Sequence, residues 1–100
     1  MKVGYTKDFV KSSRKYSGKV AKSIWEAISE VKAANSLEDI TDLKKLVGFN
    51  NIYRIRVGSL RAFITFHIEI IDDTVIFHYL VSRGEAYSKE MQSKLKRIDK

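Results

Sequence analysis

The stretch YRIRVGSLRAF, residues 53–63, decides the fold because it predicts two strands joined by a tight turn. Large apolar residues alternate with arginines from Tyr53 to Val57, and this alternation is typical of a half-buried strand. Gly58 and Ser59 form the turn, since glycine accepts the backbone conformations of short hairpins. We therefore expect a hairpin whose strands are residues 52–57 and 60–71.

The segments on either side of this hairpin extend it into a small sheet. Asp72 and Asp73 are typical turn residues, and the apolar run after them predicts a further strand at residues 74–82. Consecutive strands with such short connections form an antiparallel meander. Residues 2–6 predict one more short strand at the start of the chain.

Helical patterns precede and follow the meander. We expect the first helix to begin at a cap formed by Thr6 or Asp8, and the second to cover residues 18–33. Residues 37–46 predict a short helical turn or a packed loop. A basic amphipathic helix ends the chain, with an apolar stripe formed by Tyr87, Met91, Leu95 and Ile98.

The predicted order of elements is β-α-α-β-β-β-α, which gives an α+β fold. A small antiparallel curled β-sheet carries the N-terminal helical hairpin on one face, and a C-terminal helix follows the last strand. The other face of the sheet is expected to be at least partly open. Residues 1–100 suffice for one domain and not comfortably for two, so a single domain is expected.

Strand alternation predicts which side chains face the helices. Tyr53, Ile55 and Val57 point one way, so Arg54 and Arg56 point toward the open face. In the next strand the even positions are apolar and suit the core: Ala62, Ile64, Phe66, Ile68 and Ile70. The odd positions suit the open face: Arg61, Phe63, Thr65, His67 and Glu69. The last strand is apolar on both sides, so its orientation stays open.

The arginines on the open face indicate a negatively charged partner. Arg54, Arg56 and Arg61 fall within eight positions, and adjacent like charges repel unless an anion lies between them. Guanidinium groups bind phosphate oxygens through paired hydrogen bonds. The formal net charge of +7 also favours a polyanion such as nucleic acid.

Other classes of protein fit the sequence poorly. The chain has no cysteine, so disulfides and cysteine-rich zinc sites are excluded and a reducing cytoplasm is expected. There is no apolar run of membrane-spanning length and no signal-peptide core. His67 and His78, on neighbouring predicted strands, give no recognisable metal site. We expect a cytoplasmic protein with no membrane segment, metal or other cofactor.

Three motifs occur in an order typical of a known family. LKKLVG, residues 43–48, precedes YRIRVGSLRAF, and an apolar strand then leads to SRGEAY, residues 82–87, where Arg83 and Tyr87 have R-x-x-x-Y spacing. In these features and in element order the chain resembles the RelE/ParE superfamily of bacterial toxin–antitoxin toxins. The resemblance implies a toxin that a cognate acidic antitoxin holds inactive.

The resemblance favours the RelE-like branch, whose members cleave mRNA in the ribosomal A site without a metal. It implies a catalytic set at the matching positions, which are Arg54, Arg56, Arg61, Arg83 and Tyr87. Arg61 and Arg83 suit phosphate clamping, and Tyr87 suits stacking on the nucleotide or orienting it.

The general base is harder to assign. An arginine hardly ever loses its proton, so Arg54 and Arg56 are poor bases. Glu85 and His67 are the acid–base candidates, although Glu85 also suits an ion pair with an arginine.

Two other functions stay open at this point. ParE-like members of the superfamily poison DNA gyrase, and a shared fold does not settle the chemistry. A non-catalytic module that binds nucleic acid or antitoxin would also be compatible with the basic composition.

Overall fold

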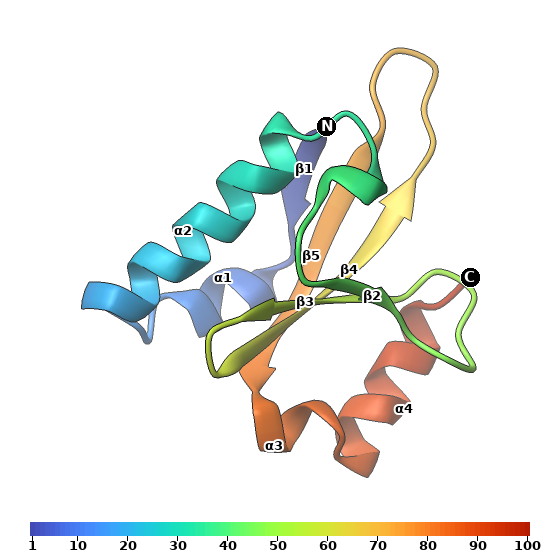
Figure 1. Cartoon of the computed structure of the whole chain (residues 1–100). Coiled ribbons are helices and arrows are strands. Elements are labelled where there is room, and N and C mark those ends of the chain that lie inside the picture. The colour runs from blue at the N-terminus through green and yellow to red at the C-terminus, as the bar shows by residue number, and fades with distance from the viewer.

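The computed structural model describes residues 1–100 and shows a five-stranded sheet with helices on both faces (Figure 1). The strand order is β1-β5-β4-β3-β2; β1 runs parallel to β5, and the other neighbours are antiparallel. The predicted α+β fold is confirmed, although the parallel β1 makes the sheet mixed. In chain order the elements are β1 (Lys2–Tyr5), α1 (Lys7–Ser13), α2 (Gly18–Ala33), a 3-10 turn (Leu37–Asp39), β2 (Leu43–Lys45), β3 (Tyr53–Val57), β4 (Leu60–His67), β5 (Thr74–Ser82), α3 (Arg83–Ala86) and α4 (Lys89–Ile98).

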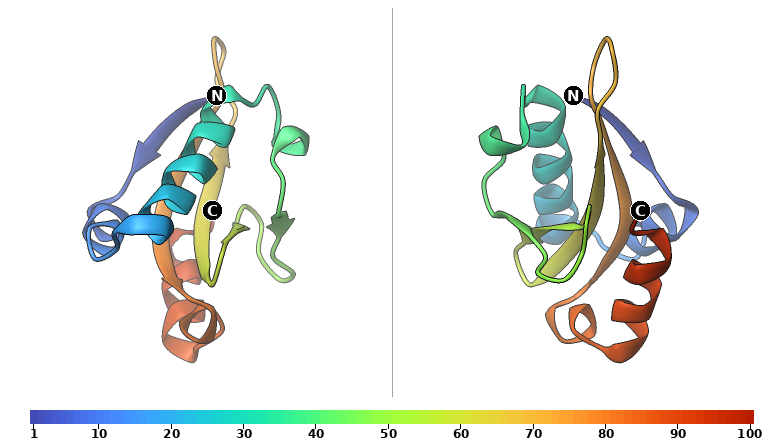
Figure 2. Two further views of the ribbon diagram at one scale, coloured as in Figure 1. Left: turned by 60° about the vertical axis from the view of Figure 1, so that its left-hand side comes forward. Right: turned by 90° about the vertical axis from the view of Figure 1, so that its right-hand side faces the viewer.

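Helix α2 covers one face of the sheet, and α1 lies beside β5 and contributes Phe9 to the core on that face (Figure 2). Thr6 is the N-cap of α1, because its hydroxyl oxygen accepts a hydrogen bond from the Phe9 N–H at 3.2 Å. The buried stripe of α2 meets alternate residues of the strands in one apolar core, which includes Ile28, Val31, Ile55, Val57, Ala62, Ile64, Val75, Phe77 and Leu80. The alternation predicted for residues 53–57 is therefore confirmed.

Helix α4 covers part of the opposite face (Figure 2). Met91 and Leu95 pack with Ile52 and Phe63 in a second, smaller core. The Asp99 carboxylate accepts hydrogen bonds from the backbone N–H groups of residues 50 and 51, each at 2.7 Å, which anchors the end of the helix. None of the helices has the length and apolar character that crossing a membrane requires.

Tyr87 lies outside the last helix. Ser88 caps α4 by accepting a hydrogen bond from the Met91 N–H, so the helix begins at Lys89. Tyr87 instead ends the short helix α3, and 62% of it is exposed. The prediction that Tyr87 opens the apolar stripe of the last helix is wrong, because the serine cap stops the helix after it.

Residues 37–46 contain a strand that the sequence pattern does not show. After the 3-10 turn, Asp42 adopts a left-handed backbone conformation with φ of 57°, and β2 follows directly. Leu43 lies opposite Ile55 of β3 and packs against the main core. The predicted helical turn is therefore correct only for Leu37–Asp39. The strand at Leu43–Lys45 was missed, because three residues are too few to show the alternation of a strand.

The predicted strand 60–71 is too long. β4 ends at His67, and the chain then forms a loop that projects beyond the helices (Figure 1). Ile68, Ile70 and Ile71 in this loop are almost fully exposed, so the prediction that Ile68 and Ile70 belong to the core is wrong. No helix reaches far enough to cover these residues, and apolar character alone did not reveal this.

Two isoleucine substitutions distinguish the core from the loop. Ile64→Ala should lower the free energy of unfolding by about 2–5 kcal/mol, because Ile64 is fully buried and the change leaves a cavity. Ile70→Ala should change it by less than about 0.5 kcal/mol, since that side chain is exposed. Urea denaturation measures both, and equal losses would contradict the placement of the loop.

A β-bulge explains why β5 is apolar on both sides. Tyr79 lies opposite Phe63, but Phe77 lies opposite Ile64, so His78 is an extra residue in β5. The bulge lets Phe77 and Leu80 both reach the main core, whereas Tyr79 and Val81 pack toward α4. His78 is consequently displaced toward the α4 side of the sheet.

Candidate functional site

Four arginines lie on or beside the α4 side of the sheet, and we call Arg54, Arg56, Arg61 and Arg83 the arginine surface. Arg56 and Arg61 occupy directly opposite positions on β3 and β4. Arg54 lies opposite Phe63 of β4 and Lys44 of β2. Because Ile55 and Val57 are buried against the helices, the strand arginines project from the other face.

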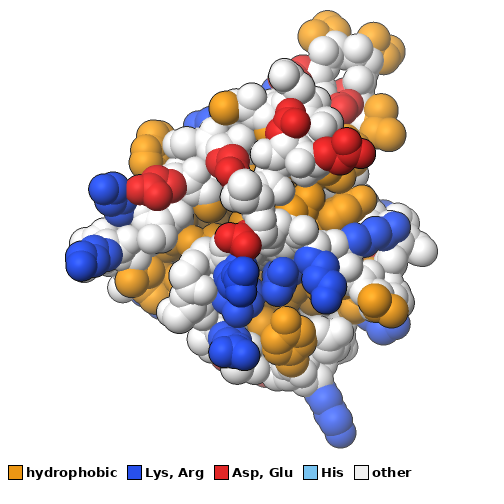
Figure 3. Space-filling model, in the orientation of Figure 1, with side chains coloured by type: hydrophobic (Ala, Val, Ile, Leu, Met, Phe, Trp, Pro, Cys, Tyr) orange, Lys and Arg blue, Asp and Glu red, His pale blue; other side chains and the backbone are white.

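Basic side chains gather around these strands. Figure 3 shows lysines and arginines over β2 and β3, with acidic side chains above them toward α2 and the segment that leads to β2. Lys44 and Lys45 of β2 are both exposed. Lys44 lies opposite Arg54 and extends the basic area, whereas Lys45 lies opposite Tyr53 and belongs to the other face of the sheet. These lysines were not among the predicted site residues, because the sequence pattern predicted a short helical turn or a packed loop at residues 37–46; the signal would have been the apolar Leu43 followed by polar residues.

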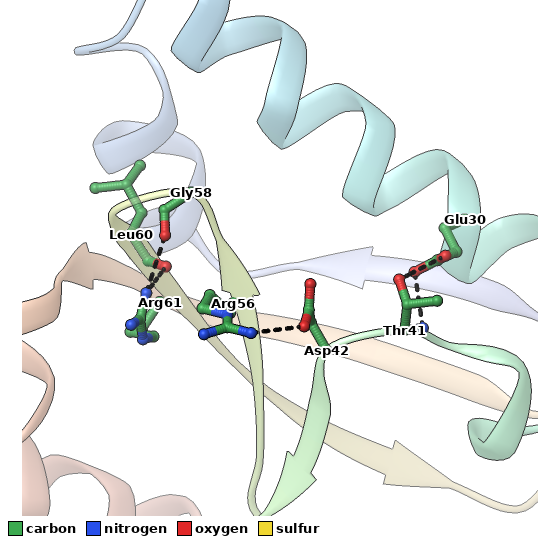
Figure 4. Close-up of polar contacts among 7 residues, drawn as sticks. All are labelled: Glu30, Thr41, Asp42, Arg56, Gly58, Leu60 and Arg61. Carbon is green, nitrogen blue, oxygen red and sulfur yellow. Dashed lines mark hydrogen bonds and ion pairs between the residues drawn. The ribbon is translucent and has the colours of Figure 1, made fainter.

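Arg61 is buried and lacks an acidic partner. Only 6% of it is exposed, and its Nη1 atom donates to the carbonyl oxygens of Gly58 at 3.1 Å and Leu60 at 2.9 Å (Figure 4). Its Nε atom has no hydrogen-bond partner, and no carboxylate lies within ion-pair distance. A buried charge with unused donors is unfavourable in the free protein and is suited to receive an anion.

Arg56 is held by the segment before β2. Its Nη2 atom lies 3.0 Å from the Asp42 carboxylate, and both side chains are about half exposed (Figure 4). The neighbouring Thr41 donates backbone and hydroxyl hydrogen bonds to Glu30 of α2, which fixes this segment on the helix. Arg56 is therefore oriented by an acidic partner, while the adjacent Arg61 is not.

The remaining arginines differ in exposure. Arg54 is partly buried, and its Nε atom also has no hydrogen-bond partner. Arg83 begins α3 with an exposed side chain, and its backbone N–H donates to the Ser59 carbonyl at 3.2 Å. This bond places the backbone of Arg83 beside the β3–β4 turn, at Ser59, two residues before Arg61 in sequence. Tyr87 follows at the end of the same short helix.

Glu85 has a structural role in the turn before α3. Its Oε1 atom accepts hydrogen bonds from the Ser82 hydroxyl at 2.9 Å and the Ser82 N–H at 3.4 Å, and the Ser82 oxygen accepts from the Glu85 N–H. This reciprocal arrangement is a capping box. The expected ion pair between Glu85 and an arginine is absent.

His67 lies away from the arginine surface. Along β4, Phe63 separates Arg61 from Thr65 on the same face, and Phe63 is buried under α4. His67 is beyond Thr65, whose hydroxyl lies 2.8 Å from the Nε2 atoms of both His67 and His78. The structure therefore does not bring His67 together with the arginines.

The protonation of His78 depends on the fold. Burial, and then the charge of His67, lower the pKa of the His78 imidazole from its ordinary value of 6.5. The unfolded chain therefore binds more protons than the folded chain as the pH falls below that value. His78 is therefore mainly neutral at neutral pH. As the pH falls below about 6.5, protonation of this imidazole in the unfolded chain lowers the free energy of unfolding.

Comparison with known proteins connects this geometry to a family. No model of a known protein family matches the chain. Toxin RelE3 of Methanocaldococcus jannaschii is 41% identical over 88 residues, which cover 87% of this chain and 96% of that protein. This similarity extends over nearly the whole relative, so it shows that the chain belongs to the same family.

Solved structures have the same architecture. In the RelB–RelE antitoxin–toxin complex from Methanococcus jannaschii, a chain 36% identical in sequence matches with a TM-score of 0.66, over 84% of this chain and 94% of that chain. A mutant of the E. coli toxin RelE in the free state matches with a TM-score of 0.66 over 97% of this chain and 96% of that chain. At 20% identity, the latter supports the fold alone.

Proposed function

Because this chain belongs to the RelE family of toxins, we propose that it is the toxin of a type II toxin–antitoxin module and that it cleaves mRNA on the ribosome. The observation that carries the cleavage proposal is the buried guanidinium of Arg61. Its Nε–H has no hydrogen-bond acceptor, it has no acidic partner, and its neighbours include two further arginines, Arg56 and Arg83. A phosphodiester supplies the missing negative charge and acceptor oxygens.

The chemistry places the largest demand on charge stabilisation. The ribose 2′-OH gives its proton to water as its oxygen attacks the adjacent phosphorus, and the bond from phosphorus to the 5′-oxygen then breaks as that oxygen takes a proton from water. Extra negative charge develops on the phosphorane between these events, where preorganised donors are most effective. We assign this stabilisation to Arg61 and Arg83, with Arg54 and Arg56 binding the flanking phosphates.

Tyr87 is suited to position the nucleotide. Its ring is exposed, and it follows Arg83 within the same short helix, so it is presented near the charged groups. Unpaired bases commonly stack on such aromatic side chains in proteins that recognise RNA. We assign Tyr87 to stacking and orientation of the nucleotide at the cut.

The partner that inhibits the protein is expected to be an acidic antitoxin. A related toxin chain was solved in complex with the antitoxin RelB, and the formal charge of +7 on this chain favours a partner of opposite sign. Expression of this chain alone should arrest growth, and co-expression of its antitoxin should restore it. Normal growth at high levels of the folded chain would contradict toxicity.

Glu85→Gln distinguishes a capping role from catalysis. Glutamine also serves at this position of a capping box, so cleavage and thermal stability should both stay near wild type. If Glu85 is instead the general base, the amide cannot take the proton and the rate should fall by about 100-fold or more. Single-turnover cleavage, with thermal melts as the folding control, separates these outcomes.

A direct test compares two targets. Purified protein should stop protein synthesis in a translating extract and leave DNA supercoiling by purified gyrase unchanged. Primer extension on the mRNA should then show new ends. Inhibition of supercoiling without mRNA cleavage would instead establish a gyrase poison of the same fold.

A further inference from the structure

His67 and His78 form a side-chain pair that the proposed cleavage does not use. His67 ends β4, His78 is the bulge residue of β5, and the Nε2 atom of each lies 2.8 Å from the Thr65 hydroxyl oxygen. The two nitrogens are therefore separated by no more than twice that distance. They converge on the Thr65 hydroxyl oxygen from two neighbouring strands, which places them to ligate a single ion bound beside that oxygen.

The hydrogen bonds of this cluster require the two histidine rings to play different roles toward the Thr65 hydroxyl. A threonine hydroxyl carries one hydrogen, so it donates to only one neutral ring, and the other ring must donate its own Nε2–H. The two rings consequently hold different tautomers. An ion bound between them would accept both Nε2 lone pairs and leave both hydrogens on Nδ1.

We propose that His67 and His78 bind one divalent transition-metal ion such as Zn²⁺, with the Thr65 hydroxyl or water completing the coordination. Imidazole nitrogen is a preferred ligand of Zn²⁺, Ni²⁺ and Cu²⁺. Two nitrogens on a tetrahedral Zn²⁺ lie about 3.3 Å apart, since each bond is about 2.0–2.1 Å long. Binding therefore requires the two Nε2 atoms to approach this separation by side-chain rotation, and the exposed His67 has room for such a movement and for water.

The surroundings of the pair favour a cation. The loop at residues 68–73 carries Glu69, Asp72 and Asp73 and no basic residue, in contrast to the chain as a whole. Lys2 is the nearby cation, and Glu69 neutralises it at 2.8 Å. The Glu69 carboxylate also accepts a hydrogen bond from the Thr74 hydroxyl at 2.7 Å, and Thr74 lies opposite His67, so this carboxylate is close to the pair.

The site is separate from the arginine surface. Phe63 and α4 lie between the two, so an ion at the histidines does not contact the bound phosphodiester. It joins β4 to β5 at the bulge, where the hydrogen-bond ladder is interrupted. Because binding requires the folded arrangement of both strands, the ion stabilises the folded state by mass action.

The test uses full-length protein without an affinity tag, stripped with a chelator and dialysed. Titration with ZnCl₂ should show one ion per chain by calorimetry, with MgCl₂ as the hard-cation control that gives no binding. Nitrogen-15 spectra should show both Nε2 signals shift and both rings become Nδ1–H tautomers. A shift in one ring only, or in neither, would overturn the proposal.

Substitutions assign the binding to the pair. His67→Gln and His78→Gln should each weaken Zn²⁺ at least about tenfold, which is the lower end of the loss seen when even an outer partner of a ligand is removed. His67 is exposed, so its substitution leaves the fold intact even if that of half-buried His78 does not. Glu38→Gln, at an exposed acid on the 3-10 turn, is the matched control and should bind as wild type. Wild-type affinity in His67→Gln would identify the ion as adventitious and overturn the assignment.

Discussion

Replacing Arg83 by alanine should lower the rate of mRNA cleavage by about 100- to 1,000-fold and leave the fold intact. The expected loss corresponds to one preorganised contact with the charge of the transition state, about 2.7–4 kcal/mol. Stability should be preserved, because the side chain is exposed and the bond to the Ser59 carbonyl comes from the backbone, which alanine retains.

The measurement is a single-turnover cleavage rate, with a thermal melt of each protein. Arg14→Ala is the matched control, since Arg14 is an exposed arginine at the end of α1 and is not part of the arginine surface. It removes the same charge and should keep near wild-type cleavage. Full activity of a folded Arg83→Ala protein would remove Arg83 from the site.

Replacing Arg61 by methionine should change stability and activity in opposite directions. Methionine has a similar volume and no charge, so the free energy of unfolding should rise by about 1–4 kcal/mol, the range seen when buried charged groups are replaced by apolar residues. The rise has two sources: the buried charge has no acidic partner, and it lies opposite Arg56. Cleavage should fall by about 100-fold or more, because the phosphate loses its buried donor.

Urea denaturation and single-turnover cleavage of the same preparation test this opposition. Arg14→Met is the surface control, with an expected change in stability of less than about 0.5 kcal/mol. A less stable Arg61→Met protein would show that the two carbonyl hydrogen bonds outweigh the burial of the charge. Unchanged cleavage would contradict the role of Arg61 as a phosphate clamp.

The sequence predicted the parts of the fold that follow regular alternation. Tyr53 to Val57 alternate strictly, so the side that meets the helices and the side that carries Arg54 and Arg56 could both be assigned. Alternation could not reveal the bulge at His78, because the extra residue is defined by its partner strand. The proximity of the two histidines follows from that bulge and was therefore not predictable.

The burial of side chains depends on what packs over them, which local patterns do not contain. Arg61 is enclosed although its residue type is usually exposed, and Ile70 is exposed although its neighbours in sequence are apolar. Similarly, the cap at Ser88 separates Tyr87 from the stripe that its spacing indicated. The candidate site could thus be listed by residue, but its charge state and exposure required the structure.

The most direct test of the account is cleavage of a ribosome-bound mRNA in which the nucleotide at the cut carries hydrogen in place of its 2′-OH. Wild-type protein should cut the unmodified mRNA and leave a 2′,3′-cyclic phosphate, because the 2′-oxygen is the nucleophile. It should not cut the 2′-deoxy version at that position, although both bind the same phosphates. Equal cleavage of the two mRNAs would contradict the proposed chemistry, and cleavage of neither by active, folded protein would contradict the function.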